Sequence, residues 1–271
     1  MNGSLKSEKF ELVYTEGESR AALLWENHCH AQFEMIAVLE GEVSVMLEGE
    51  EYHLQKHHTI IVPPLCYHSI TVRESGVYRR VTALFDADLI PGVIRERFLK
   101  GGGNAALSFL PISEQLKELI LEGKPQFFAP LAESLMVQIF YDAAQSEGKH
   151  VGAVADDFLQ KTIFYIDGHL HEKIRLEELA RLTSRSKSSF CHLFEEKMKI
   201  SPKQYILQKK LALAAGLIDE GTPPTVAATQ IGYENYSNFY RLYVKQFGTN
   251  PTRKKTQRLA SRPLDTKGKI C

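Results

Sequence analysis

The sequence lacks the features that mark membrane, secreted and disulfide-bonded proteins. It contains no run of about 20 uninterrupted apolar residues, the length that crosses a bilayer, and its first residues, MNGSLKSEKFELVY, lack the apolar core of a secretory signal. Its four cysteines, Cys29, Cys66, Cys191 and Cys271, form no C-x-x-C pair, which argues against a disulfide framework or a structural zinc module. We therefore expect a cytoplasmic protein with reduced thiols and no membrane partner.

Motifs for nucleotide binding and hydrolysis are missing as well. There is no G-x-x-x-x-G-K-[ST], no G-x-G-x-x-G after a strand and no G-x-S-x-G elbow. The triple glycine at 101–103 lacks the lysine of a phosphate loop. We therefore expect no nucleotide site.

The charge is balanced overall but unevenly distributed. Lys and Arg together number 33, as do Asp and Glu. Residues 1–150 carry 13 basic and 21 acidic side chains, a net charge of −8, which leaves 20 basic and 12 acidic for residues 151–271, a net charge of +8. Because each neutralised phosphate releases condensed counterions, the second part suits double-stranded DNA as a partner. On charge alone, a solvated basic surface explains the excess equally well.

The first third of the chain has the pattern of short β-strands. Glycines and polar pairs separate eight segments: FELVY, AALLW, FEMIAVLEG, EVSVMLEG, EEYHLQ, HTIIVPP, HSITV and RRVTALF. Strands spaced this closely, with turns at Glu40-Gly41 and Glu48-Gly49-Glu50, favour an antiparallel sandwich or barrel over a parallel sheet.

After the glycine-rich break at 101–104, the pattern lengthens into two predicted helices, over residues 113–121 and 130–145. The second carries apolar residues at helical spacing: Leu131, Leu135, Ile139 and Phe140. This face either packs on the strand domain or pairs with the same helix of a second subunit to give a homodimer. Residues 146–154 are the expected linker, and the chain beyond them reads as helical.

The C-terminal part contains an internal repeat. SSFCHLFEEKMKISP (188–202) aligns without a gap on SNFYRLYVKQFGTNP (237–251), at an offset of 49 residues. Each copy has a short helix, a tight turn and a second helix, with Ser186 and Asn235 as predicted N-caps and Gly232 in the second turn. A helix over 202–218 joins the copies, so that two second helices could enter major-groove faces about 34 Å apart.

These residues resemble the DNA-binding domain of the AraC/XylS family of bacterial transcription regulators over residues 155–256. The segments that carry the resemblance are LEELA (176–180), Ser186, FCHLF (190–194), SPKQY (201–205), IGY (231–233), SNFYRLYVKQFG (237–248) and Pro251. The resemblance implies that exposed side chains of the two second helices read base edges while nearby bases hold phosphates. It makes RNA polymerase a further candidate partner.

By position, the DNA-binding candidates fall on the two second helices. They are Lys187, Ser188, Cys191 and His192 in the first copy, and Tyr236, Ser237, Asn238, Tyr240 and Arg241 in the second. Arg241 is the strongest candidate because a guanidinium pairs bidentately with guanine or clamps phosphate; the alternative is a surface ion pair. His192 stands where the family usually has arginine, so the first copy is expected to make weaker base contacts. Pro223-Pro224 predict a short helix at the start of the second copy.

A second constellation lies in the strand region. His28-x-His30-x3-Glu34 and, later, Pro63-x4-His68 resemble the two motifs of the cupin barrel, in which such residues converge on one divalent metal. Imidazole and carboxylate suit zinc, iron, nickel or manganese. AraC-type regulators commonly retain this skeleton without a metal, so the alternative is an effector site formed by the same four residues with stacking surface from Trp25, Phe33 and Tyr67.

Together these features predict an α+β protein of two domains, an N-terminal antiparallel, cupin-like or jelly-roll-like β-barrel and a C-terminal all-α double helix-turn-helix. We place the effector-sensing barrel at 1–100, a helical connector that could dimerise at 101–150, the DNA-binding domain at 151–258 and a basic tail at 259–271. The predicted function is a DNA-binding regulator that responds to a small effector, for which the resemblance favours a sugar or another metabolite. Such a regulator is not an enzyme, has no catalytic residues and requires no cofactor. The alternatives are a metal-dependent cupin enzyme and a metal sensor, both of which would use a divalent metal at His28, His30, Glu34 and His68.

Overall fold

The computed structural model describes residues 2–7, 9–19, 27–73, 76–100, 107–109, 112–122, 125–145 and 156–252. The chain divides into two compact units, an N-terminal one that contains residues 32–153 and a C-terminal one that contains residues 154–264 together with the short segment 28–31. Within the described segments, every helix is too short or too polar to span a membrane.

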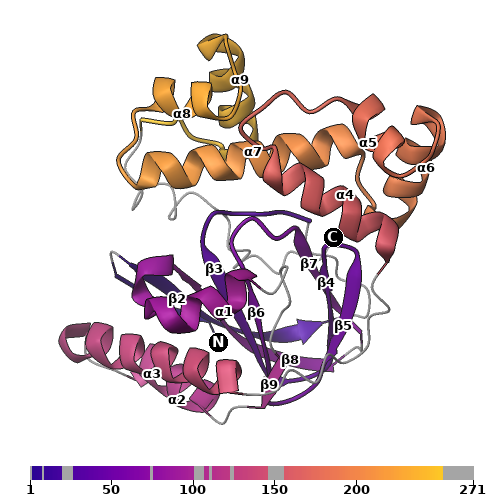
Figure 1. Cartoon of the computed structure of the whole chain (residues 1–271). Coiled ribbons are helices and arrows are strands. Elements are labelled where there is room, and N and C mark those ends of the chain that lie inside the picture. Colours follow the sequence, from indigo (N-terminus) through magenta and orange to yellow (C-terminus); the bar gives the residue numbers. More distant parts are fainter. Residues whose placement is uncertain are drawn as a thin grey trace. The chain divides into compact units, whose positions relative to one another are not determined.

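Two antiparallel sheets form the core of the N-terminal unit (Figure 1). The larger has the order β1-β2-β8-β3-β6-β9, with strands β1 (Gly3–Lys6), β2 (Phe10–Ser19), β8 (Gly76–Phe85), β3 (Phe33–Glu40), β6 (His58–Val62) and β9 (Leu107–Phe109). The smaller has the order β5-β4-β7, with strands β5 (Glu50–Leu54), β4 (Val43–Leu47) and β7 (His68–Val72). Apolar residues of both sheets, among them Ile36, Ile60, Val45 and Val72, share one buried cluster, so the sheets pack face to face.

The expectation of a closed barrel is wrong for the part of the chain that the structure describes, since both sheets remain open. β3 pairs with β8 along one edge and with β6 along the other. Both edges of β3 are therefore occupied, and β4, although it follows β3 closely, pairs instead with β5 and β7. Alternation in a sequence shows which face a side chain takes but not which strand is its neighbour. The predicted strand AALLW lies outside the described residues.

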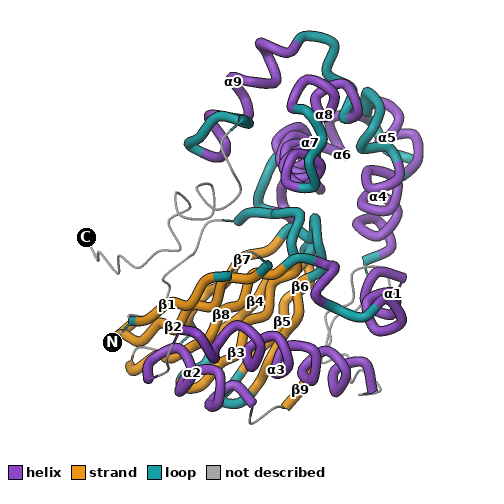
Figure 2. The backbone as a smooth tube through the Cα atoms, turned by 90° about the vertical axis from the view of Figure 1, so that its left-hand side faces the viewer, coloured by secondary structure: helices purple, strands orange, loops and turns teal. Residues whose placement is uncertain are grey.

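Helices cover the other face of the larger sheet. The helical elements that follow β8 are a short 3-10 helix (Ala87–Leu89), α1 (Gly92–Lys100), α2 (Ile112–Glu122) and α3 (Pro125–Gln145). Figure 2 shows α2 and α3 lying along the strands, and Ile139 and Phe140 of α3 are buried in one cluster with Phe33 and Phe85 of the sheet. The predicted apolar face of residues 130–145 thus packs on the strand domain, although Leu131 remains 50% exposed.

The C-terminal unit is all helical, as predicted. It comprises α4 (Asp157–Gly168), α5 (Leu176–Leu182), α6 (Lys187–Met198), α7 (Pro202–Asp219), α8 (Pro224–Gln230) and α9 (Tyr236–Phe247). Pro224 occupies the first turn of α8, where its missing amide hydrogen costs nothing, and the helix is short, as expected. The proposed linker at 146–154 and the tail at 259–271 lie outside the described residues.

The repeat read from the sequence is present in the structure. The bounds of α6 and α9 differ by the predicted offset of 49 residues. Ser186 accepts a hydrogen bond from the Ser189 amide, and Asn235 accepts one from the Asn238 amide. These side chains satisfy amide groups that have no partner within the helix. The two copies therefore begin their second helices in the same way.

Candidate DNA-binding surface and histidine cluster

The second helix of each repeat presents polar side chains to solvent. In α6 Lys187, Ser188 and His192 are exposed and Cys191 is half-buried, whereas Phe190 and Phe194 point into the core. The helix therefore has one buried and one solvent-facing side, and the sequence-predicted residues lie on the latter. Lys187 forms an ion pair of 2.7 Å with Glu177 on α5, which raises the pKa of Lys187 and competes with contact to a phosphate.

The corresponding face of α9 is larger and more aromatic. Ser237, Asn238, Tyr240 and Arg241 are exposed. Tyr236 is half-buried, because its ring packs 5.8 Å from the ring of Phe239 in the core. Within residues 156–252, no acidic side chain is ion-paired with Arg241, so the surface ion pair considered as the alternative is not found. Its guanidinium is available to an external anion.

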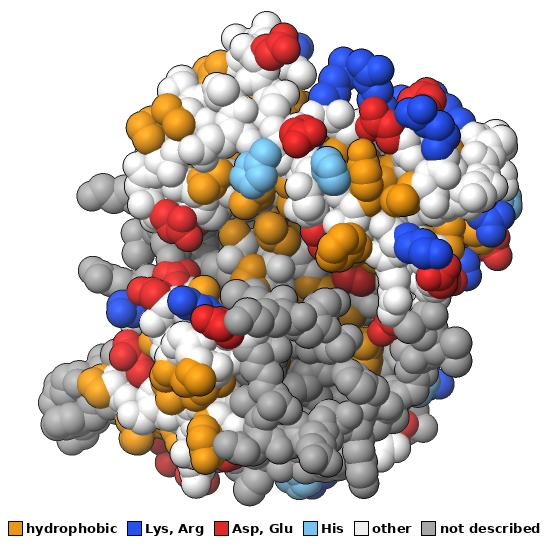
Figure 3. Space-filling view, viewed as in Figure 1, with side chains coloured by type: hydrophobic (Ala, Val, Ile, Leu, Met, Phe, Trp, Pro, Cys, Tyr) orange, Lys and Arg blue, Asp and Glu red, His pale blue; other side chains and the backbone are white. Residues whose placement is uncertain are grey.

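Basic side chains also gather elsewhere on the C-terminal unit. On the face drawn in Figure 3, Lys and Arg side chains lie over the part of the unit that holds α5 and α6, with acidic side chains among them. A mixed surface of this kind holds DNA less strongly than a uniformly basic one. The exposed side chains of α6 and α9 are therefore the more specific candidates for contact with DNA.

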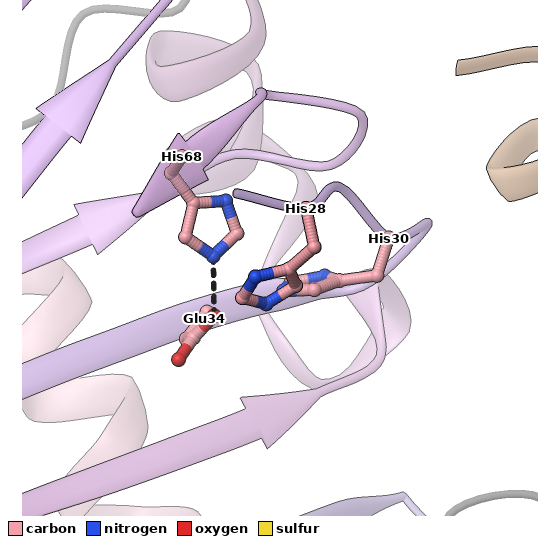
Figure 4. A group of neighbouring side chains, drawn as sticks. All are labelled: His28, His30, Glu34 and His68. Atoms are coloured by element: carbon pink, nitrogen blue, oxygen red, sulfur yellow. Dashed lines mark hydrogen bonds and ion pairs between the residues drawn. The ribbon is translucent and has the colours of Figure 1, made fainter. Parts of the chain in front are cut away.

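The predicted histidine constellation comes together in the structure. His28 and His30 precede β3, Glu34 lies on β3 and His68 begins β7. One ligand atom from each residue lies within 4.8 Å of the others, and Figure 4 shows the three rings and the carboxylate converging. His30, Glu34 and His68 are buried and His28 is half-buried. Residues separated by as many as 40 positions thus form one cluster.

The hydrogen bonds of His68 define its protonation. Its Nδ1 lies 2.9 Å from the carbonyl oxygen of Cys66; a carbonyl can only accept, so Nδ1 carries a hydrogen. Nε2 then faces the Glu34 carboxylate at 2.8 Å, and two acceptors at this distance require a cation between them or a shared proton. Burial alone would lower the pKa of His68, but the bond and charge of Glu34 raise it above its ordinary value.

This donor set fits a divalent transition metal. Three imidazoles and one carboxylate are ligands that zinc, iron, nickel and manganese accept. The backbone carbonyl of Cys66 orients His68 as outer-shell carbonyls orient metal-bound imidazoles, leaving Nε2 toward the cluster. The residues present could therefore hold such an ion, whose chemistry would be that of a Lewis acid.

The predicted aromatic residues do not all share this site. Phe33 is adjacent to Glu34 on β3 and therefore points to the opposite face of the sheet. There it stacks on Phe85 with ring centroids 5.7 Å apart and meets Phe140 edge-on. The expectation that Phe33 provides an effector with stacking surface is thus corrected: it is a core residue. Tyr67, which precedes His68 in the sequence, is buried, and its backbone amide donates a hydrogen bond to the Glu48 carboxylate. Trp25 lies outside the described residues.

Sequence reasoning missed two buried lysines on α7, Lys209 and Lys210. Lys209 forms a 2.6 Å ion pair with Asp167 on α4. Lys210 donates to the carbonyl oxygens of Glu172 and Ile231. The signal that could have indicated them is their place in the middle of a helix otherwise rich in leucine and alanine, where a pair of lysines interrupts the apolar pattern.

Comparisons with known proteins cover both units. The model of the AraC-like ligand binding domain matches residues 14–140, and a helix-turn-helix domain model matches residues 179–257. YobQ of Bacillus subtilis (strain 168), named an HTH-type transcriptional regulator, is 26% identical over 84% of this chain and 88% of its own length. YdiP of Escherichia coli (strain K12), named likewise, is 32% identical over 46% of this chain and 41% of its own length.

Among solved structures, ToxT from Vibrio cholerae aligns with 95% of this chain and 100% of its own, at 11% identity and a TM-score of 0.43. The two domain models and the named relatives agree with the fold of each unit and with the paired helix-turn-helix repeats. The chain belongs to the AraC/XylS family of transcription regulators, with an AraC-like ligand-binding domain followed by a helix-turn-helix domain.

Proposed function

We propose that this regulator binds double-stranded DNA sequence-specifically through the exposed faces of α6 and α9, and that a small effector in the N-terminal unit controls the binding. The observation that carries the proposal is the repeat itself. Two helices of 12 residues, each with its own N-cap, present polar side chains at equivalent positions. Such helices are of the right size to lie in the major groove.

Within this proposal the two helices contribute unequally. Arg241 provides the strongest base or phosphate contact, and Ser237, Asn238 and Tyr240 surround it on α9. On α6 the side chains of Ser188, Cys191 and His192 are shorter or weaker donors than arginine. We expect the half-element read by α9 to be the more strongly conserved part of the operator.

DNA selection from a random pool with the full-length chain tests this function. We expect an enriched motif with two half-elements about one helical turn apart. Arg241→Ala should relax the preference at one position of one half-element and weaken binding by about 1–3 kcal/mol, the contribution of a good bidentate contact. Lys161→Ala is the matched control, because Lys161 is an exposed base on α4. Binding that depends on salt alone, without an enriched motif, would overturn the proposal.

We also propose that the regulator is a homodimer. The solvent-facing side of α3 carries two large apolar side chains, Leu131 and Tyr141, each about half exposed. Burial of such side chains against a second copy is favourable by the hydrophobic effect. Light scattering of the wild-type chain should give twice the monomer mass, and Leu131→Glu should shift it toward the monomer.

A second candidate function, a metal sensor, is favoured by the histidine cluster. Binding of a divalent ion at His28, His30, Glu34 and His68 would replace a shared proton with a doubly charged ion. We favour a sensor over a metal-dependent enzyme because the nearest further carboxylate among the described residues that acts on His68, Glu48, already accepts a hydrogen bond from the Tyr67 amide. Metal analysis after incubation with Zn²⁺ and dialysis should give one ion per chain, and Co²⁺ should give the visible absorption of a bound site. His68→Ala should abolish both signals; a wild-type chain that retains no metal would exclude the sensor.

A further inference from the structure

Two adjacent lysines are buried in the middle of α7. Lys209 is 1% exposed and Lys210 is 7% exposed. An ammonium group removed from water is costly unless it is fully paired, and burial lowers the pKa of Lys210. A buried lysine is compatible with a stable fold only if the hydrogen bonds and ion pairs of its ammonium group offset the free-energy cost of desolvation.

Lys210 bonds to parts of both repeats. Its ammonium group donates to the carbonyl oxygen of Ile231 at 2.7 Å, and also to that of Glu172. Ile231 is the C-cap of α8, in the second repeat. Glu172 lies in the loop between α4 and α5, which leads into the first repeat. One side chain therefore connects α7 to both helix-turn-helix elements.

The backbone is closely packed around this ammonium group. His171 Nδ1 donates to the carbonyl oxygen of Gln230 at 2.9 Å, a second bond between the same loop and the end of α8. A Cβ added to Gly232 would lie 3.4 Å from the His171 oxygen, the Glu172 carbonyl carbon and the Lys210 Nζ. The turn before α9 thus packs directly against the loop before α5. We name His171, Glu172, Lys210, Gln230, Ile231 and Gly232 the inter-repeat junction.

Without this junction, α7 alone would connect the repeats. α8 and α9 pack on α7 in a buried cluster whose described members include Leu211, Ala227 and Phe239 but no residue of α4, α5 or α6, so without the junction their orientation relative to α6 would depend on their packing against α7 alone. Successive major-groove faces are about 34 Å apart on one side of B-DNA. A small rotation of α8 and α9 on α7 would displace α9 from its major-groove face. Both half-elements are therefore bound together only if that rotation is restricted.

We propose that Lys210 is a positioning residue for DNA recognition and that the inter-repeat junction sets the spacing of the half-elements bound by α6 and α9. This inference rests on the proposed DNA-binding function. Lys210 itself touches no DNA, since it is buried within the unit. Its role is to hold the two recognition helices at one separation.

The experiment uses the full chain and the selected operator, with the distance between its half-elements changed by one to five base pairs. For the wild type we expect affinity to fall at least tenfold, about 1.4 kcal/mol, at altered spacings. Lys210→Met removes the donors but retains the length of the side chain. We expect it to lose at least tenfold on the natural spacing, to show a smaller penalty for altered spacing, and to bind each isolated half-element as the wild type does. Lys203→Met, an exposed lysine on the same helix, should behave as the wild type.

His171→Leu provides a second test that leaves the buried lysine in place, should Lys210→Met fail to fold by circular dichroism. It should also reduce the spacing penalty. The proposal is overturned if the DNA affinity of the folded variants depends on spacing as that of the wild type does. It is also overturned if the variants lose as much affinity for isolated half-elements as for the whole operator, which would indicate general destabilisation. A wild-type chain without sequence preference would instead overturn the proposed function, and the role of the junction with it.

Discussion

Asp156 shows how one side chain can stabilise a helix and connect it to a neighbour. It is the N-cap of α4, where its Oδ1 accepts from the amides of Phe158 and Leu159. Its Oδ2 also forms an ion pair of 2.5 Å with Lys197 on α6. Burial would raise the pKa of Asp156, but the bond to Lys197 and the two amides hold it below its ordinary value.

The lowered pKa of Asp156 predicts a pH dependence of stability. A carboxyl group whose pKa is lower in the folded chain contributes stability above its unfolded pKa, 3.8, and loses it as the pH falls through the folded value. Asp156→Asn retains a capping oxygen but no charge. We expect it to lower the free energy of unfolding at pH 7 by about 1 kcal/mol or less, because the pair is partly exposed, and to have no effect near pH 2. Urea denaturation at both pH values measures this; an equal difference at both would contradict the pKa assignment.

Capping residues were readable from the sequence because their role is local. Ser186 and Asn235 precede apolar helical patterns, and both bond as predicted. The histidine cluster was predicted from spacing, and the structure brings its members together. Lys210 could not be found in this way, because its partners are carbonyl groups, which every residue carries. Phe33 was predicted as stacking surface from its nearness to Glu34 in the sequence, but adjacent residues of a strand point to opposite faces of the sheet.

The second helices of the two repeats end in the same backbone conformation, but the residue at the C-cap differs. The C-cap of α6 is Lys199, with φ of 56°, and that of α9 is Gly248, with φ of 66°. Both are in the left-handed region, which costs a non-glycine residue about 1 kcal/mol. No heavy atom lies within 4 Å of a Cβ added to Gly248, so the backbone conformation alone determines the effect of a substitution.

We therefore predict opposite effects at the two C-caps. Lys199→Gly should raise the free energy of unfolding by about 0.5–1 kcal/mol, and Gly248→Lys should lower it by about 1 kcal/mol. Thermal unfolding of both variants measures the difference. Gly168→Ala at the end of α4, where added atoms meet nothing within 4 Å and φ is not in the left-handed region, is the control. Changes of the same sign at Lys199 and Gly248 would show that contacts other than the backbone dominate.

Whole elements were predicted more reliably where they are helical. The expected helices over 113–121 and 202–218 correspond to α2 and α7 within about two residues, because helical periodicity and caps are properties of adjacent residues. Strands β1 and β9 were missed; each is four residues or shorter, too short to show alternation. The division into two open sheets depends on pairing between distant strands, which no local pattern encodes.

At the scale of the whole molecule, charge separates the two activities proposed for it. Residues 1–150 carry a net charge of −8 and residues 151–271 a net charge of +8. An acidic first part is repelled by phosphate, so contact with DNA is directed to the second part. We therefore propose that a ligand bound at the histidine cluster acts on DNA binding through a change in conformation or assembly.

If the histidine cluster senses a metal, its coupling to DNA must be reciprocal. The factor by which Zn²⁺ changes the Kd for DNA must equal the factor by which operator DNA changes the Kd for Zn²⁺. We expect a common factor of about 5 to 150, the usual range of allosteric coupling. Fluorescence anisotropy of labelled operator, with and without Zn²⁺, gives one factor, and chelator competition with and without operator gives the other. Glu34→Gln should weaken Zn²⁺ binding while leaving metal-free DNA affinity unchanged. Arg241→Ala should weaken DNA binding while leaving the affinity for Zn²⁺ alone unchanged. If Zn²⁺ binds and the Kd for DNA stays constant, the cluster binds metal without regulating DNA binding.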